Sequence, residues 1–175
     1  MKLATSADRP GHDVVIPARL ASALEASGPN FRTFRCAEFD TAITTPDVGW
    51  SVPFDSMQSP STVLADFDGD GRMDVAVLQH SKNEIRFVVA LDRNPIPEVL
   101  ELERWPNSVA ERPEPLQKFL TRTAAGPIDI PNWDTGERDT TLQLAHGGVA
   151  IGVWEKASDL YYFTNGHFHS VTTSD

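Results

Sequence analysis

Cysteine is almost absent from the 175-residue chain: Cys36 stands alone. A disulfide within the chain and a cysteine-based zinc site are therefore excluded. Basic residues are also few, since 15 Lys and Arg stand against 25 Asp and Glu, which gives a net charge of −10. This balance argues against nucleic acid or an anionic membrane as a partner and favours cations or basic proteins. No apolar run reaches the roughly 18 residues needed to span a bilayer.

The hydrophobic share of 40% is too high for a disordered chain, and the length suits one domain with a sizeable core. We therefore expect a single domain over residues 1–175, with a disordered tail at residues 1–12. The N-terminus lacks the apolar segment of a signal peptide. It fits a cytoplasmic protein, or a mature chain whose leader has been removed, and the polar residues Asp8, Arg9 and Pro10 favour the second.

The hydrophobic pattern predicts an α+β fold, in which two helices pack on one antiparallel sheet of about six or seven strands. Residues 17–27 and 115–123 each begin with a proline, carry leucines on one face and precede a Gly-Pro pair, so both are predicted to be helices. A long irregular segment is expected at residues 45–60. Strands are predicted over Ser61–Ala65, Met73–Leu78, Ile85–Leu91 and Val99–Glu103.

Two C-terminal hairpins complete the predicted β-meander. A turn at Gly147-Gly148 would place Leu144 opposite Ile151 and Leu142 opposite Val153. A turn at Asn165-Gly166, one of the strongest hairpin signals, would pair residues on either side in the same way. The expected pairs are Phe163 with Phe168, Tyr162 with His169, and Leu160 with Val171.

One motif carries recognisable chemistry, and it occupies residues 66–74 with the sequence DFDGDGRMD. Alternate residues of a tight loop can turn their oxygens inward, and calcium takes six to eight oxygen ligands. The predicted ligands are the carboxylates of Asp66, Asp68, Asp70 and Asp74 and the backbone carbonyl of Arg72. Position 12 of an EF-hand loop would be a glutamate, but Val77 stands there, so a nine-residue loop between two β-strands is expected instead.

Residues 63–78 resemble the calcium-loop portion of FG-GAP or VCBS-type repeats, which occur in integrin-like propellers. The resemblance implies the same ligand set, including the carbonyl of Arg72. A propeller needs at least four blades, and this chain has one such loop, so a full propeller is not expected. The chain more closely resembles small bacterial envelope proteins with a single loop of this kind, some of which are lysozyme inhibitors or immunity proteins.

Simpler interpretations exist for the loop and for two other groups of residues. The loop could be a solvated acidic turn, or its metal could be catalytic, but a structural calcium ion is the favoured prediction because four close carboxylates repel one another without a cation. His167 and His169 could hold zinc, although no third ligand is evident, and a solvated hairpin with Tyr162 stacked on His169 is favoured. Cys36 is expected to be a small buried hydrophobe.

Trp50 and Phe54 in the long segment, and Trp133 in a second expected loop at residues 128–134, are candidate partner-binding residues. Exposed aromatic side chains often dominate interfaces, although each of these could instead fold back over the core. Flanking acids such as Asp55 and Asp129 would suit a cationic partner.

These observations predict a non-enzymatic, calcium-stabilised binding protein of the bacterial envelope, such as an inhibitor or immunity protein against a secreted cell-wall hydrolase. A weak calcium loop fills where calcium is near millimolar, which favours a periplasmic or extracellular location. The alternatives are a small metal-dependent hydrolase and a structural or adhesive module.

Overall fold

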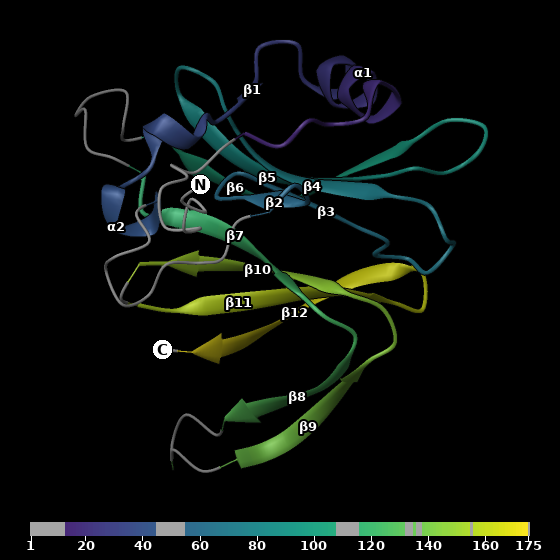
Figure 1. Ribbon diagram of the computed structural model, residues 1–175, viewed down its shortest axis with the longest axis vertical. Coiled ribbons are helices and arrows are strands. Elements are labelled where there is room, and N and C mark those ends of the chain that lie inside the picture. Colours follow the sequence, from purple (N-terminus) through teal and green to yellow (C-terminus); the bar gives the residue numbers. More distant parts are fainter. Residues whose placement is uncertain are drawn as a thin grey trace, which may run out of the picture.

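The computed structural model describes residues 13–44, 55–107, 116–131, 135, 138–154 and 156–174. They form a mostly β structure with two short α-helices, α1 at Ala18–Ser27 and α2 at Thr41–Thr44 (Figure 1). A 3-10 turn at Cys36–Glu38 precedes α2. Neither of these described α-helices has the length and apolar character that crossing a lipid bilayer requires. The tail expected at residues 1–12 lies outside the described residues.

The strands form three antiparallel sheets, none of which closes on itself within the described residues. The first sheet has the order β2-β3-β4-β5-β6, with β1 also paired to β4. The second has the order β12-β11-β10-β7, and the third consists of β8 and β9. The expectation of antiparallel strands is confirmed, but the strands divide among sheets of six, four and two rather than forming one. One of the two predicted helices is present, as α1, so the described structure is mostly β rather than evenly α+β.

The bounds of the strands in the six-stranded sheet are β1 Arg32–Thr33, β2 Gln58–Ser59, β3 Thr62–Ala65, β4 Asp74–His80, β5 Glu84–Leu91 and β6 Glu98–Pro106. Those in the four-stranded sheet are β7 Lys118–Thr123, β10 Gly148–Val153, β11 Ser158–Thr164 and β12 His167–Ser174. The two-stranded sheet consists of β8 Gly126–Pro131 and β9 Arg138–Leu144. The four strands predicted between residues 61 and 103 are confirmed as β3 to β6.

These elements stack in four layers, with α1 at the top of Figure 1 and the β8–β9 hairpin at the bottom. Leu20 and Leu24 of α1 pack on one face of the six-stranded sheet. The other face packs on the four-stranded sheet, where the largest cluster of buried side chains includes Phe67 and Phe87. The β8–β9 hairpin packs on the four-stranded sheet through a third, smaller cluster that includes Leu144.

Strands β4 and β5 lie inside this stack and are buried almost throughout. Residues 75–78 and 87–91 are continuously apolar. Because successive side chains of a strand point to opposite faces, such a run fits a strand that is covered on both sides. The loop that precedes β4 is therefore attached to one of the most firmly packed parts of the molecule.

The C-terminus of α1 is held by Arg86 of β5, which is 3% exposed. Its Nη2 donates to the carbonyl oxygen of Leu24 at 3.4 Å and to Oγ of Ser27 at 3.3 Å. A cation is favourable at this end of a helix because the last carbonyl groups are unpaired. A Cβ at Gly28 would lie 2.5 Å from the same Nη2, so the glycine leaves room for the guanidinium where the helix ends. The helix predicted over residues 17–27 is confirmed.

The second predicted helix is wrong, because Lys118–Thr123 forms strand β7. Leucines at positions 116 and 120 fit a helix and a strand equally well, and pairing with β10 decides between them. Phe119 lies opposite Gly152, where an added Cβ would be 2.8 Å from its ring. The glycine makes room for the aromatic side chain in the sheet. The second helix is α2, which the sequence analysis did not predict.

The hairpin at Asn165-Gly166 is confirmed with its predicted register, which pairs Phe163 with Phe168 and Tyr162 with His169. Asn165 and Gly166 have φ values of 51° and 83°. Positive φ at both central positions is the requirement of a type I′ turn, which explains why Asn-Gly is so strong a signal.

The prediction of a hairpin at Gly147-Gly148 is wrong. Leu144 pairs with Gly126 of β8, and β10 pairs instead with β7 and β11. Alternation of apolar residues shows which face of a strand is buried, but it does not identify the neighbouring strand. The segment 128–131, expected to be part of a loop, belongs to β8 and pairs with β9.

Candidate metal centre

The acidic loop, residues 66–73, joins β3 to β4 as predicted. Two glycines allow its tight path, since Gly69 and Gly71 have φ values of 77° and 82° in the left-handed region. Asp66 holds both of them: its Oδ1 accepts from N–H of Gly69 at 2.7 Å, and its Oδ2 accepts from N–H of Gly71 at 2.9 Å. The first carboxylate thus fixes the backbone of the loop.

The carboxylates of Asp68 and Asp70 each accept a hydrogen bond from the backbone two residues later. Oδ1 of Asp68 accepts from N–H of Asp70 at 3.3 Å, and Oδ1 of Asp70 accepts from N–H of Arg72 at 2.9 Å. The second oxygen of Asp70 lies 3.1 Å from Nη2 of Arg72. The charge of Asp70 is therefore paired with a cation from the loop itself.

Asp74, the first residue of β4, is 1% exposed. Its Oδ2 accepts from N–H of Phe67 at 2.9 Å, and its Oδ1 accepts from N–H of Asp92 at 2.8 Å. Burial raises the pKa of Asp74 to about 6, against the opposing effect of these two hydrogen bonds. The negative charges of Asp68 and Asp66 raise this pKa further. The carboxyl group is thus buried next to like charges.

Asp66, Asp68 and Asp74 converge, with one carboxylate oxygen from each lying within 4.8 Å of the others. Within the part of the chain that the structure describes, this is the one group of three or more such side chains able to hold a metal ion. All its donors are carboxylate oxygens, the type that hard cations such as Ca²⁺ and Mg²⁺ prefer. A buried carboxylate beside two others also fits a cation, because a positive charge would offset their repulsion.

The structure thus brings together three of the four predicted carboxylate ligands. Asp70 is outside the convergent group and contacts Arg72 instead. The carbonyl of Arg72 remains a predicted ligand. The predicted loop between two strands is present, and its last carboxylate is the one that β4 buries.

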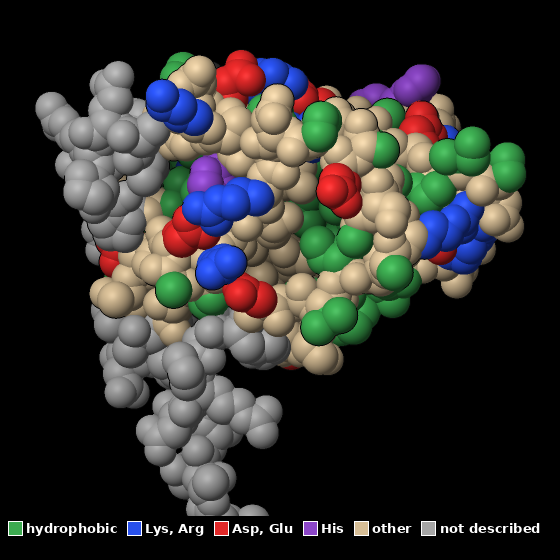
Figure 2. Space-filling model, turned by 90° about the horizontal axis from the view of Figure 1, so that it is seen from above, with side chains coloured by type: hydrophobic (Ala, Val, Ile, Leu, Met, Phe, Trp, Pro, Cys, Tyr) green, Lys and Arg blue, Asp and Glu red, His purple; other side chains and the backbone are tan. Residues whose placement is uncertain are grey.

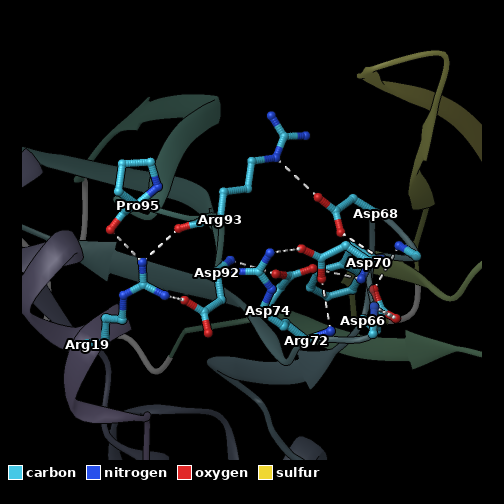
Figure 3. A network of polar contacts seen from close by, with 12 residues as sticks. Arg19, Asp66, Asp68, Asp70, Arg72, Asp74, Asp92, Arg93 and Pro95 are labelled. Atoms are coloured by element: carbon cyan, nitrogen blue, oxygen red, sulfur yellow. Dashed lines mark hydrogen bonds and ion pairs between the residues drawn. The ribbon is translucent and has the colours of Figure 1, made fainter.

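Arg93, Asp92 and His146 lie next to the convergent carboxylates or the acidic loop, and the sequence analysis identified none of them as neighbours. Arg93 donates from Nε to Oδ2 of Asp68 at 3.1 Å, and the N–H of Asp92 bonds to Asp74 (Figure 3). The imidazole of His146 lies against Gly69, where a Cβ would be 2.0 Å from its Cε1. Nothing in the local pattern around these residues marks them as neighbours of the acidic loop.

The connection between β5 and β6 also joins the loop to α1. Arg19 of α1 pairs with the carboxylate of Asp92, and its Nη2 donates to the carbonyl oxygens of Arg93 at 2.7 Å and Pro95 at 2.8 Å (Figure 3). Arg93 therefore contacts both the acidic loop and the helix, and the neighbouring Asp92 contacts both Asp74 and the helix.

The predicted partner-binding residues Trp50, Phe54 and Trp133 lie outside the described residues. Met57, from the same long segment, is partly buried and packs on the cluster beneath α1. Figure 2 shows the α1 side of the molecule, where acidic and basic side chains are mixed rather than gathered into one patch of a single sign.

The two histidines of β12 and the single cysteine match the simpler interpretations, a solvated hairpin and a buried hydrophobe. His167 and His169 are exposed, and the ring of His169 stacks on Tyr162 at 5.7 Å between centroids. Cys36 is 8% exposed, and burial raises the pKa of its thiol to about 11. A thiol with that pKa is a poor nucleophile at neutral pH.

Comparison of the chain with protein-family models, with curated proteins and with solved structures found no match. The interpretation of the acidic loop therefore depends on its own residues and geometry.

Proposed function

We propose that this protein binds Ca²⁺ at the acidic loop and uses it as a structural ion. The observation that carries the proposal is the convergence of Asp66 and Asp68 on Asp74, a carboxylate that is 1% exposed. Asp70 and the carbonyl of Arg72 are proposed to complete the ligand set. The spacing of these residues, which resembles that of FG-GAP or VCBS-type calcium loops, supports calcium over magnesium.

The position of Asp74 supports a structural role. This residue begins β4, and its carboxylate also bonds to the backbone of Asp92 at the end of β5. A bound cation would supply positive charge where the β3–β4 hairpin meets the β5–β6 connection. It would thereby stabilise the folded state, since the unfolded chain lacks the assembled site.

Calorimetric titration of chelator-treated protein with CaCl₂ tests this proposal. We expect a dissociation constant in the micromolar to millimolar range, where extracellular modules reach about 10⁻⁴–10⁻³ M. Asp68→Asn should weaken binding strongly, while Glu25→Asn, which removes an equal charge at an exposed position of α1, should not. Absence of heat and of any thermal shift at millimolar calcium would contradict the proposal.

We further propose that the protein is a non-enzymatic binding protein outside the cytoplasm, with a basic secreted hydrolase as its partner. The net charge of −10 supports a cationic partner, because opposite charge speeds encounter. A low-affinity calcium loop supports a periplasmic or extracellular setting, where calcium is near millimolar. The role would be that of an inhibitor or immunity protein.

Inhibition assays with a basic lysozyme, in calcium and at low and high salt, test this second proposal. We expect inhibition at stoichiometric protein, with association slowed at high salt because the charges are then screened. Lack of inhibition at large excess would contradict the lysozyme-inhibitor role and leave the calcium proposal standing.

A further inference from the structure

Arg93 is fixed at the edge of the acidic loop by three contacts from different elements. Its Nε donates to Oδ2 of Asp68 at 3.1 Å, and its Nη1 pairs with Glu98 of β6. Its guanidinium lies over the ring of Phe163 of β11, 5.4 Å from the centroid. The side chain of Asp68 is 7% exposed, so this ion pair is shielded from water on the Asp68 side. Burial of this kind strengthens a charge interaction.

Arg93 carries the positive charge that is paired with the convergent carboxylates. Asp66, Asp68 and Asp74 bring three negative charges together, and the nearby Arg72 forms its ion pair with Asp70 instead. Among the described residues, Arg93 is the cationic side chain that forms an ion pair with a member of the convergent group. It therefore offsets part of the charge that a metal ion would offset.

We propose that Arg93 is a built-in counter-ion that sets how tightly the acidic loop binds a divalent cation. This inference rests on the proposed calcium function. Arg93 occupies one oxygen of Asp68 and adds a positive charge next to the site, so a cation must share Asp68 with it and overcome its repulsion. The arginine keeps the loop folded while holding its calcium affinity low.

A counter-ion and a merely structural arginine predict opposite changes in affinity. Loss of a structural arginine would loosen Asp68 and weaken calcium binding. Loss of a counter-ion would remove a repulsive charge and tighten it. In both cases the protein should be less stable in chelator, since Arg93 pairs with two carboxylates.

The experiment is calorimetric titration of the full chain with CaCl₂, combined with thermal melts in chelator. Arg93→Gln keeps a hydrogen-bond donor but removes the charge, and Arg93→Lys keeps the charge. Arg104→Gln is the matched control, because Arg104 also bridges two carboxylates, Glu84 and Glu101, on the exposed side of β5 and β6. Both glutamine variants should melt at lower temperature than the parent protein in chelator.

We expect Arg93→Gln to bind calcium about tenfold more tightly than the parent protein, while Arg93→Lys and Arg104→Gln bind as the parent does. Unchanged or weaker binding by Arg93→Gln, with the parent protein binding normally, would overturn this inference alone. If neither the parent nor Arg93→Gln binds calcium, both this inference and the proposed function fail. Binding by Arg93→Gln but not by the parent would support the inference and contradict the proposed function.

Discussion

The six-stranded sheet and the β8–β9 hairpin are both antiparallel, yet they are held in very different ways. Strands β4 and β5 are covered by α1 on one side and by the four-stranded sheet on the other. The hairpin packs on one side, through a small cluster in which Leu144 is buried and Ile128 and Leu142 are partly buried. The six-stranded sheet, which carries the candidate metal centre, is thus covered on two sides, while the hairpin is held through its contacts with the four-stranded sheet.

The largest expected difference comes from truncating a side chain in the central interface. Phe87 is 0% exposed, and its ring lies 5.1 Å from that of Tyr161 in the opposite sheet. Phe87→Ala should lower the free energy of unfolding by about 3–5 kcal/mol, because it removes contacts and leaves a cavity. Urea denaturation followed by circular dichroism measures the change. A loss below about 1 kcal/mol would show that the two sheets are not packed as described.

Calcium should increase the difference in stability between the six-stranded sheet and the β8–β9 hairpin. At about 100 times its dissociation constant, an ion that binds only the folded state adds about 2.7 kcal/mol. Hydrogen exchange should slow most at the N–H groups of Phe67 and Asp92, which bond to Asp74. The β8–β9 hairpin should exchange as before wherever it opens without unfolding the sheet. Equal slowing in both regions would contradict a local effect of the ion.

The smallest effect is expected in the hairpin itself. Ile128 is partly buried, so Ile128→Ala should cost about 1 kcal/mol of local stability, in proportion to the apolar area removed. The hairpin amides should then exchange about fivefold faster. The amides of β5 should be unaffected, and acceleration there would show that the hairpin and the six-stranded sheet unfold as one unit.

The same contrast explains how much of the fold could be predicted from the sequence. Where local chemistry determines structure, as at α1, at the Asn165-Gly166 turn and along β3 to β5, the predictions are confirmed. Where a strand needs a distant partner, they fail. Leucines at 116 and 120 could not reveal that β7 pairs with β10, and the alternation around Leu144 could not identify β8 as its neighbour.

At the candidate metal centre, too, the local features were predicted and the long-range contacts were not. The spacing of Asp66, Asp68 and Asp74 predicted their convergence, because the short loop that holds the first two leads directly into the third. Arg93 and His146 come from other parts of the chain and carry no local signal. Nor could the sequence show that Asp70 would pair with Arg72 and lie outside the group. Long-range contacts decide these details, and they become visible only when the strands are assembled.

The packing of α1 has a practical consequence for shortening the chain. A version starting after Gly28 would lose Leu20 and Leu24, which cover the outer face of the six-stranded sheet. It would expose Val75, Val77 and Val88 to water as a contiguous hydrophobic patch, and such patches promote aggregation. It would also strip Arg86 of the helix oxygens that solvate its charge. Recombinant production and crystallisation therefore call for a version of the chain that retains this helix.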